Sequence, residues 1–369
     1  MTRAIVIGAG PSGLACAACL QRVGVDVEIL ERAACVGSSW HGHYERLHLH
    51  TVRGRSGLPF LPMPKTYGKF PSRAQMIGYL DAYARHFGLE PVFGTEVSNV
   101  VRSGAGWQVS HSGGQAVADV VVFATGMNNA AKSAGLPGME AFAGPVVHSS
   151  QYNTADAYAG KSVLVVGFGN SGGDIALDLA EHGARPTLSV RGPVNILPHS
   201  LFGVPITSLG GLRKVLPYRW ADAITAPILR AKIGRPEDYG LRSAGKGPAA
   251  QVIEDGRVPL IDIGTLAAIK AGKIAVRPGV ANVGARQVAF TDGSAGAFDA
   301  IILATGYRVD LRNMLPDAAE ALTAEGRPKV SGAPSPVKGL YFCSYKASAD
   351  GQLRQSGLEA KAIAADVSG

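Results

Sequence analysis

The 369-residue sequence lacks any apolar run of the ~18–20 residues that would span a bilayer. Its first ten residues, MTRAIVIGAG, carry one arginine and a short apolar run. This run leads into a glycine-rich turn and not into a cleavage site. We therefore expect a first β-strand at the amino terminus, and neither a signal peptide nor a transmembrane segment.

Cysteine is scarce, and the four residues are Cys16, Cys19, Cys35 and Cys343. The C-x-x-C spacing of Cys16 and Cys19 is also that of a redox dithiol. Both lie in the small-residue stretch GLACAACL, however, which favours a helix in which cysteine is a packing residue. So few cysteines predict a reducing, cytoplasmic location.

Acidic residues are outnumbered, with 28 against 36 basic ones and a formal net charge of +8. A positive chain suits anionic ligands, but the basic residues are scattered and form no stripe interleaved with aromatic residues. We therefore expect a small-molecule substrate and no nucleic acid. No metal site is predicted, and the sequence leaves a homodimer open.

Glycine is abundant, with 48 residues, which together with 46% hydrophobic residues is typical of α/β proteins. The length fits two domains. Within it, AIVIGAGPSGLACAACLQRVGVDVEILER (4–32) aligns without gaps to VLVVGFGNSGGDIALDLAEHGARPTLSVR (163–191). Each copy predicts a strand, a G-x-G-x-x-G turn, a helix and a second strand. Each then reaches signals of a β-meander and an apolar strand closed by Ala-Thr-Gly, at 120–126 and 300–306.

The duplication favours two dinucleotide sites over two unrelated glycine turns. In such a turn the first glycine permits a tight bend, the second lets the backbone approach the pyrophosphate, and the third lets the helix pack on the strand. The helix N-terminus then faces the phosphates. The predicted residues are Gly8, Gly10, Pro11, Ser12, Gly13, Ala124, Thr125 and Gly126 in the first copy, and Gly167, Gly169, Asn170, Ser171 and Gly172 in the second.

The two copies differ at the end of the second strand. The first has Glu31, whose carboxylate is placed to accept hydrogen bonds from ribose hydroxyls. The aligned residue of the second copy is Val190, followed by Arg191, whose guanidinium suits a ribose 2′-phosphate. We therefore predict FAD at the first site and NADPH at the second; the alternative for Arg191 is an ordinary surface arginine.

Between the copies, FAGPVVHSSQY fits F-x-G-x-x-x-H-x-x-x-Y through Phe142, Gly144, His148 and Tyr152. This stretch resembles the identifying sequence of flavin-containing monooxygenases; Baeyer–Villiger monooxygenases look similar there but typically end it in tryptophan. The resemblance extends over almost the whole chain and is closest to the YUCCA-like branch and its bacterial relatives. Matching stretches include GSSWHGHYERLHLHT, FPSRAQMIGYLDAYARHFGL and PLIDIGTLAAIKAGKIAV.

The resemblance implies an NADPH- and FAD-dependent monooxygenase that uses O2 and acts through a hydroperoxyflavin. The plant relatives convert indole-3-pyruvate to indole-3-acetate by oxidative decarboxylation. One alternative is S- or N-oxygenation of a small soft nucleophile. Others are a flavin reductase without oxygen insertion and a non-catalytic sensor on the same fold. A disulfide reductase would need a dithiol beside the flavin, whereas Cys16 and Cys19 follow the pyrophosphate loop.

The resemblance also assigns site residues. His50 stands where many flavin-containing monooxygenases have asparagine, and is either the hydrogen-bond donor to the oxygenated flavin or a structural residue. His148 is expected to belong to a linker that sets the angle between the domains, or to cap a turn, and not to transfer protons. The other expected flavin contacts are Arg32, Ser39, Trp40, Thr51, Gln75, Val97, Gly351, Gln352 and Leu353.

The expected fold class is α/β, with two Rossmann-like dinucleotide-binding domains, each with a β-meander, and the NADPH domain inserted into the FAD domain. We expect the FAD domain at residues 1–155 and 298–369, and the NADPH domain at 156–297. The segment 194–250 belongs to neither Rossmann unit. A packed helical insertion is favoured there over a substrate lid or a membrane-surface helix.

Overall fold

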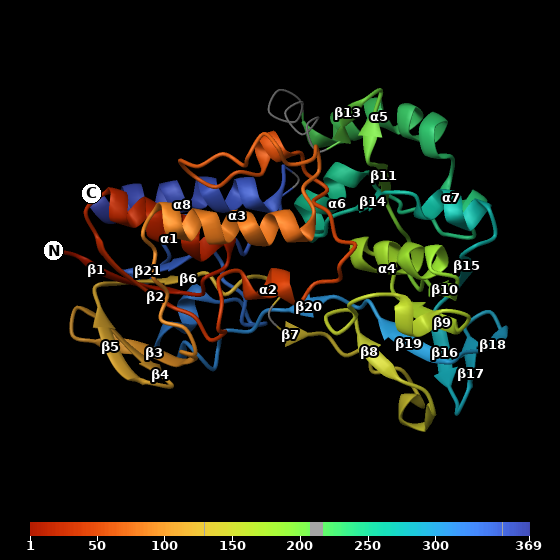
Figure 1. Ribbon diagram of the computed structural model, residues 1–369, viewed down its shortest axis with the longest axis horizontal. Helices are drawn as coiled ribbons and strands as arrows, with labels where there is room; N and C mark the ends of the chain where they lie inside the picture. Colours follow the sequence, from red (N-terminus) through yellow and green to blue (C-terminus); the bar gives the residue numbers. More distant parts are fainter. Residues whose placement is uncertain (129, 207–216, 349) are drawn as a thin grey trace. The chain divides into compact units, whose positions relative to one another are not determined.

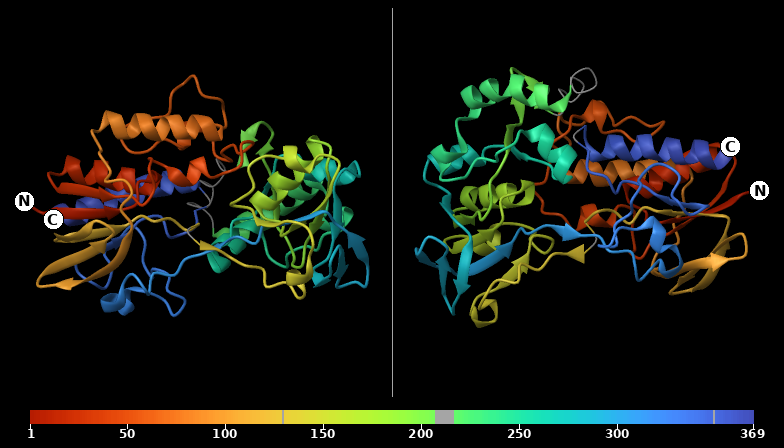
Figure 2. Two further views of the ribbon diagram at one scale, coloured as in Figure 1. Left: turned by 60° about the horizontal axis from the view of Figure 1, so that its bottom comes forward. Right: turned by 180° about the vertical axis from the view of Figure 1, so that it is seen from behind.

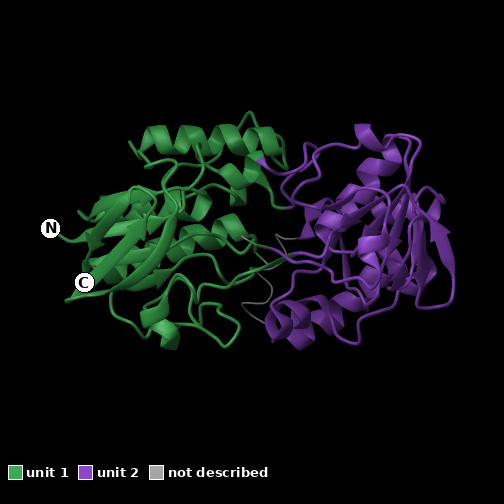
Figure 3. Ribbon diagram, turned by 90° about the horizontal axis from the view of Figure 1, so that it is seen from below, with its two compact units in different colours: residues 1–41, 51–130, 307–369 green, residues 42–50, 131–306 purple. Residues whose placement is uncertain are grey.

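The computed structural model describes residues 1–128, 130–206, 217–348 and 350–369. The chain forms two compact units (Figures 1 and 3). Unit 1 comprises Met1–His41, Thr51–Ala130 and Tyr307–Gly369, and unit 2 comprises Gly42–His50 and Ala131–Gly306. Unit 2 therefore interrupts unit 1 in the sequence, which confirms the predicted insertion of one dinucleotide-binding domain into the other.

Unit 1 is built on a four-stranded parallel sheet in the order β2-β1-β6-β21. Ile5 and Ile7 of β1 are buried against the meander that covers one face, in a core that also holds Trp107. Helix α1 follows β1 and packs against α8. Both faces of a parallel sheet must be covered, so its strands are continuous apolar runs. The strands are β1 (Arg3–Ile7), β2 (Asp26–Leu30), β6 (Val120–Phe123) and β21 (Leu340–Phe342), with the meander β3 (Val97–Ser103), β4 (Gly106–His111) and β5 (Gly114–Ala118). The helices are α1 (Pro11–Arg22), α2 (Ser38–His41), α3 (Arg73–His86) and α8 (Gln352–Ser368).

Unit 2 repeats this plan with a five-stranded parallel sheet in the order β15-β10-β9-β19-β8. Helix α4 follows β9, as α1 follows β1, and a second meander packs on the other face of the sheet (Figures 1 and 2). The predicted duplication is thus confirmed as two Rossmann-like units. The strands are β8 (Val146–His148), β9 (Ser162–Val166), β10 (Arg185–Ser189), β15 (Ala275–Arg277) and β19 (Ala300–Leu303), with the meander β16 (Val280–Val283), β17 (Gln287–Phe290) and β18 (Ala295–Ala297). The helices are α4 (Asn170–Glu181) and α7 (Thr265–Lys270).

The segment between β10 and α7 contains two helices and short strands. Helix α5 (Tyr218–Ile233) packs against α6 (Pro248–Asp255), so the expected helical insertion is present, although residues 207–216 lie outside the described part. Trp220, Ile224 and Ile228, spaced by four residues on α5, stay exposed. The short strands are β11 (Ile196–Pro198), β12 (Ser200–Leu201), β13 (Val204–Pro205) and β14 (Leu260–Asp262).

The domain borders differ from the predicted ones. Residues 131–155, expected in the first domain, belong to unit 2 because β8 pairs with β19 and Phe142 is buried beside Phe290 and Phe298. Residues 298–306 also belong to unit 2, since they contain β19. The chain passes between the units near β7 (Ala130–Ala131) and β20 (Tyr307–Arg308), which pair with each other. Within the described ranges, no helix is long and apolar enough to cross a membrane.

Candidate cofactor sites and active-site residues

The first glycine loop joins β1 to α1 and leaves no room for side chains at two of its glycines. Gly8 has a φ of 107°, and a Cβ there would stand 2.9 Å from the carbonyl oxygen of Ala124. A Cβ on Gly13 would stand 1.8 Å from the carbonyl oxygen of Gly8. Gly10, in contrast, has no protein atom within 4 Å of a Cβ. The loop is thus tightly packed on its inner side and open at Gly10, which fits a pyrophosphate at the start of α1.

Glu31 lies beside this loop with its carboxylate buried. Its Oε2 accepts a hydrogen bond from the backbone N–H of Ala9 at 2.7 Å, and its Oε1 accepts one from Ala33 at 2.9 Å. Because each carboxylate oxygen has two lone pairs, each can accept a further bond from a ribose hydroxyl. The backbone donors hold the carboxylate in place and leave one lone pair free on each oxygen, so the arrangement fits the adenosine ribose of FAD.

The second glycine loop has the same geometry. Gly167 has a φ of 108°, and a Cβ there would stand 2.5 Å from the carbonyl oxygen of Ala304. A Cβ on Gly172 would stand 2.2 Å from the carbonyl oxygen of Gly167, whereas Gly169 has no protein atom within 4 Å. A second pyrophosphate therefore fits at the start of α4 as the first does at α1.

The neighbours of the second loop differ from those of the first. Arg191 is exposed, and its guanidinium has no hydrogen bond or ion pair with any residue in the described ranges. Its charge is thus available to a 2′-phosphate. The Asn170 side chain, in contrast, accepts from the N–H of Ile261 at 2.8 Å and donates to the carbonyl of Pro259 at 3.4 Å. The Asn170 side chain therefore ties β14 to the loop. Its predicted contact with NADPH remains a prediction, and only its backbone is left to make that contact.

Several residues predicted to contact the flavin meet at the start of α8. A Cβ on Gly351, whose φ is 99°, would stand 2.6 Å from Cγ2 of Thr51. Gln352 donates from Nε2 to Oγ of Ser344 at 2.6 Å, and Ser12 on α1 bonds to Ser356 at 3.0 Å. The structure thus brings Thr51, Gly351 and the first glycine loop's helix to the same end of α8, where orphan N–H groups suit an anionic or carbonyl ligand. Leu353 is buried in α8.

Most of the remaining predicted flavin residues have structural partners. The carbonyl of Trp40 accepts from Nε of Arg73 at 2.9 Å, which ties α2 to α3. Gln75 forms the capping box of α3 with Ser72, because each side chain accepts from the other residue's N–H. Their flavin contacts stay predictions. So do those of the exposed Ser39 and Arg32, of Thr125, whose hydroxyl meets that of Tyr345 at 2.7 Å, and of Val97, which is buried in the core of unit 1.

His50 is half-buried, and burial lowers its pKa to about 4. Its imidazole is therefore neutral at pH 7 and can donate one hydrogen bond. The ring of His199 packs edge-on against it, with centroids 6.3 Å apart. The sequence did not identify His199, because it lies in the segment 194–250 that matches neither Rossmann unit.

The F-x-G-x-x-x-H-x-x-x-Y motif is held entirely by unit 2. His148 ends β8; its Nδ1 accepts from the N–H of Ser150 at 3.2 Å, so its Nε2 donates to the carbonyl of Gly306 at 3.1 Å. A Cβ on Gly144 would stand 2.4 Å from the carbonyl oxygen of Asp299. The Tyr152 hydroxyl donates to Asp178 on α4 at 2.6 Å, and burial, together with this bond, raises the pKa of the tyrosine. His148 therefore fixes the motif to the Ala-Thr-Gly loop, which favours a structural role over proton transfer.

Comparisons with known proteins agree with this geometry. Residues 5–198 match the pyridine nucleotide-disulphide oxidoreductase family. The chain is 41% identical over 332 residues to the indole-3-pyruvate monooxygenase YUCCA1 of Oryza sativa subsp. japonica, covering 89% of this chain and 82% of that protein. It is 37% identical to the probable indole-3-pyruvate monooxygenase YUCCA4 of Arabidopsis thaliana, over 92% and 84% of the two chains.

Among solved structures, the flavin-containing monooxygenase from Stenotrophomonas maltophilia superposes with a TM-score of 0.77. The match covers 100% of this chain and 98% of that one, at 25% sequence identity. The two glycine loops and their helices therefore belong to a fold that is known from a flavin monooxygenase over its full length.

Proposed function

Because the chain belongs to the YUCCA-type flavin monooxygenases of the pyridine nucleotide-disulphide oxidoreductase family, we propose that it decarboxylates an aryl-pyruvate oxidatively. The protein is an NADPH- and FAD-dependent monooxygenase. The observation that carries the substrate proposal is the 41% identity, over 89% of the chain, to an indole-3-pyruvate monooxygenase. In the overall reaction, an aryl-pyruvate, O2, NADPH and a proton give an aryl-acetate, CO2, NADP⁺ and water.

The residues divide between the two cofactors. The first loop, through Gly8, Gly10 and Gly13, holds the pyrophosphate of FAD at α1. Glu31 accepts hydrogen bonds from the ribose hydroxyls of FAD. The second loop holds the pyrophosphate of NADPH, and Arg191 pairs with its 2′-phosphate. Bound FAD, once reduced by NADPH, supplies the two electrons that activate O2.

His50 is the proposed catalytic residue. As a neutral imidazole it donates a single N–H hydrogen bond, and its half-buried position limits the access of water. A donor of this kind favours oxygen transfer over release of hydrogen peroxide, since it stabilises negative charge on the reacting oxygen. The net charge of +8 favours an anionic substrate such as a keto acid.

The test is NADPH-dependent oxygen uptake by the FAD-loaded enzyme. Indole-3-pyruvate or phenylpyruvate should accelerate oxygen uptake and release CO2 in equal amounts. His50→Ala should divert most of the reducing equivalents to hydrogen peroxide, because the donor is lost. A thioether and a tertiary amine serve as comparison substrates. If they are oxygenated efficiently while both keto acids are inert, the decarboxylase proposal fails.

The location and assembly also stay proposals. Cys16, Cys19, Cys35 and Cys343 are all free thiols, which suits the proposed cytoplasmic location. A homodimer is testable by light scattering of the FAD-loaded protein, with a mass of 38.1 kDa expected for the monomer's polypeptide.

A further inference from the structure

Residues 42–50, which we call the strap, leave unit 1 after His41, pack on unit 2 and return to unit 1 at Thr51. His50 is the last residue of the strap. The strap contains no helix and no strand, and only His48 forms an isolated β-bridge. Its placement therefore depends on side-chain contacts and on single backbone hydrogen bonds, and not on a ladder of secondary structure.

The strongest of these contacts joins the strap to helix α4. The Tyr44 hydroxyl donates to the Asp174 carboxylate at 2.8 Å, and both side chains are 3% exposed. Among the described residues, Tyr44 is the only hydrogen-bond donor to this carboxylate. A buried carboxylate without a donor is costly, so loss of the tyrosine hydroxyl leaves an unsatisfied group in the core. Burial of the Asp174 carboxylate therefore depends on the Tyr44 hydroxyl.

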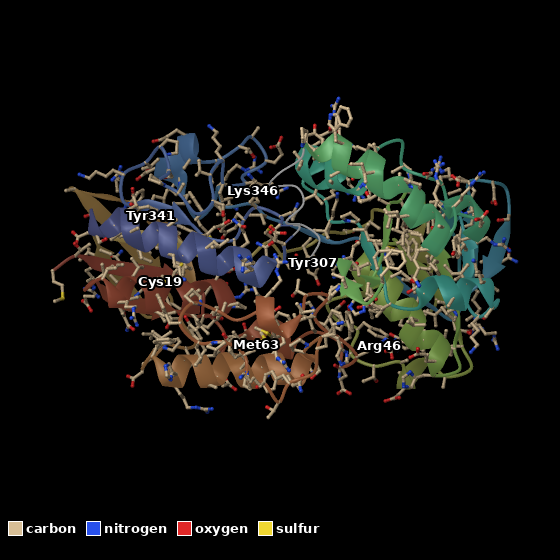
Figure 4. All side chains as sticks on the ribbon, turned by 90° about the horizontal axis from the view of Figure 1, so that it is seen from above. Cys19, Arg46, Met63, Tyr307, Tyr341 and Lys346 are labelled. Carbon is tan, nitrogen blue, oxygen red and sulfur yellow. The ribbon has the colours of Figure 1, made fainter. Side chains whose placement is uncertain are left out.

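Three further contacts extend the attachment. Arg46 forms an ion pair with Glu181 at the end of α4 (Arg46 is labelled in Figure 4). The N–H of Glu45 donates to the carbonyl of Asn153 at 3.0 Å, and Leu47 packs against the core of unit 2. The strap is thus bonded both to α4 and to the residue that follows Tyr152 of the motif.

We propose that Tyr44 and Asp174 are positioning residues for His50: their hydrogen bond fixes the strap on α4 and thereby fixes the imidazole. Asp174 lies four residues after Asn170, the first residue of α4, so about one helical turn separates the anchor from the NADPH loop. The helix that binds NADPH at its N-terminus therefore also sets where His50 stands. This inference rests on the proposed function only for the catalytic role of His50.

Electrostatics at Asp174 support the pairing. Burial raises the Asp174 pKa to about 6, while Tyr44, Arg46 and His48, all on the strap, lower it. Asp178, on the same helix, raises it. The groups that favour the charged carboxylate thus come from the strap itself, so release of the strap removes their stabilisation at once.

Two measurements on the FAD-loaded protein test the anchor without any turnover. The first is amide hydrogen exchange, by mass spectrometry, of peptides that cover the strap. Tyr44→Phe should accelerate their exchange about ten- to a hundredfold, because a buried charged acceptor loses its donor. The second is the titration of His50 by NMR of histidine-labelled protein, with the signal assigned by its loss in His50→Ala. In Tyr44→Phe the His50 pKa should rise from about 4 toward its usual value as water reaches the ring.

Two variants serve as controls. Tyr341→Phe removes a tyrosine–carboxylate bond in unit 1, from the Tyr341 hydroxyl to the exposed Asp366 at 2.5 Å, and should change neither readout (Tyr341 is labelled in Figure 4). Asp174→Asn keeps an acceptor for Tyr44 and should leave strap exchange within about fivefold of the unaltered protein, because the bond to a neutral acceptor is weaker by only about 1 kcal/mol. If Tyr44→Phe does not fold, Arg46→Gln removes the ion pair between the strap and Glu181 and should produce smaller shifts in the same direction.

The outcomes separate the inference from the proposed function. Unchanged strap exchange or an unchanged His50 titration in Tyr44→Phe overturns the anchor. Shifts in both readouts, absent in Tyr341→Phe, support it whatever the substrate is. The keto-acid assay of the unaltered enzyme decides the proposed function independently.

Discussion

Helices α1 and α4 begin at glycine loops of the same geometry, but their buried faces differ. Positions 15 and 19 of α1 are Ala15 and Cys19, and the aligned positions of α4 are Asp174 and Asp178. The face of α1 packs on α8 through small side chains, whereas the two carboxylates of α4 accept from buried tyrosines. The end that binds a dinucleotide is thus retained, while the buried face is adapted to different neighbours.

The difference teaches which part of a Rossmann unit is constrained by the cofactor. Backbone approach to a pyrophosphate needs the glycines at both loops. The remainder of the helix needs only to be buried, and a carboxylate is tolerated there when a donor reaches it. Asp174 and Asp178 show this tolerance, since the hydroxyls of Tyr44 and Tyr152 donate to them.

The largest effects are expected from alanine substitutions at the tightly packed glycines, which should affect a different cofactor in each loop. Gly13→Ala places a Cβ 1.8 Å from the Gly8 carbonyl, and Gly172→Ala places one 2.2 Å from that of Gly167. Backbone must shift in both, so we expect loss of stability of roughly 3 kcal/mol or more. Gly13→Ala should also lose flavin, measured as absorbance per chain, whereas Gly172→Ala should keep flavin and raise the KM for NADPH.

The open glycines give the matched control. Gly10 and Gly169 have negative φ angles and no protein atom within 4 Å of a Cβ. Alanine at either position should leave the unfolding temperature almost unchanged and still weaken the binding of the corresponding cofactor. Full flavin content in a folded Gly10→Ala protein would contradict the assignment of FAD to the first loop.

The next effect sharpens the comparison at the strand ends. Arg191→Ala should raise the KM for NADPH about ten- to a hundredfold, because a charged hydrogen-bonding partner of the 2′-phosphate is lost. The KM for NADH, which lacks this phosphate, should stay nearly constant. Steady-state kinetics with both cofactors measure the effect, and equal losses for the two would make Arg191 a structural residue.

The sequence predicted the features that depend on local backbone. The two strand–glycine-turn–helix–strand copies and the two meanders follow from spacing and composition, and the structure confirms them. The cofactor roles of the glycines stay predictions. The sequence did not predict the membership of residues 131–155 in unit 2, because a three-residue strand, β8, determines it through pairing with β19.

The sequence also did not predict contacts between residues that are far apart in the chain. Tyr44 and Asp174 are 130 residues apart, and the aligned position in the first copy is Ala15, so the duplication gave no hint of the pair. The contact between His199 and His50 was not predicted for a related reason, since His50 belongs to the strap, which is in neither repeat. Long-range partners of this kind need the fold before they can be identified.

The smallest expected effect concerns the buried charge that α1 lacks. The folded-state pKa of Asp174 is about 6, raised by burial above its ordinary value of 3.8. Ionised Asp174 therefore disfavours the folded state, and its contribution to stability is full below about pH 4 and is lost as the pH rises through 6. Two pKa units correspond to about 3 kcal/mol, of which a weaker bond from Tyr44 to a neutral acceptor offsets about 1 kcal/mol.

Asp174→Asn should accordingly stabilise the protein by about 1–2 kcal/mol at pH 8 and leave its stability at pH 4 unchanged. Denaturant unfolding at the two pH values measures the difference, with FAD present at a fixed concentration because bound cofactor adds its own stabilisation. Ala15→Asp in α1, at a fully buried position, should destabilise at pH 8 and less at pH 4. A stabilisation by Asp174→Asn that is equal at both pH values would show that the carboxyl group has the same pKa in the folded and unfolded protein, and would contradict the raised pKa.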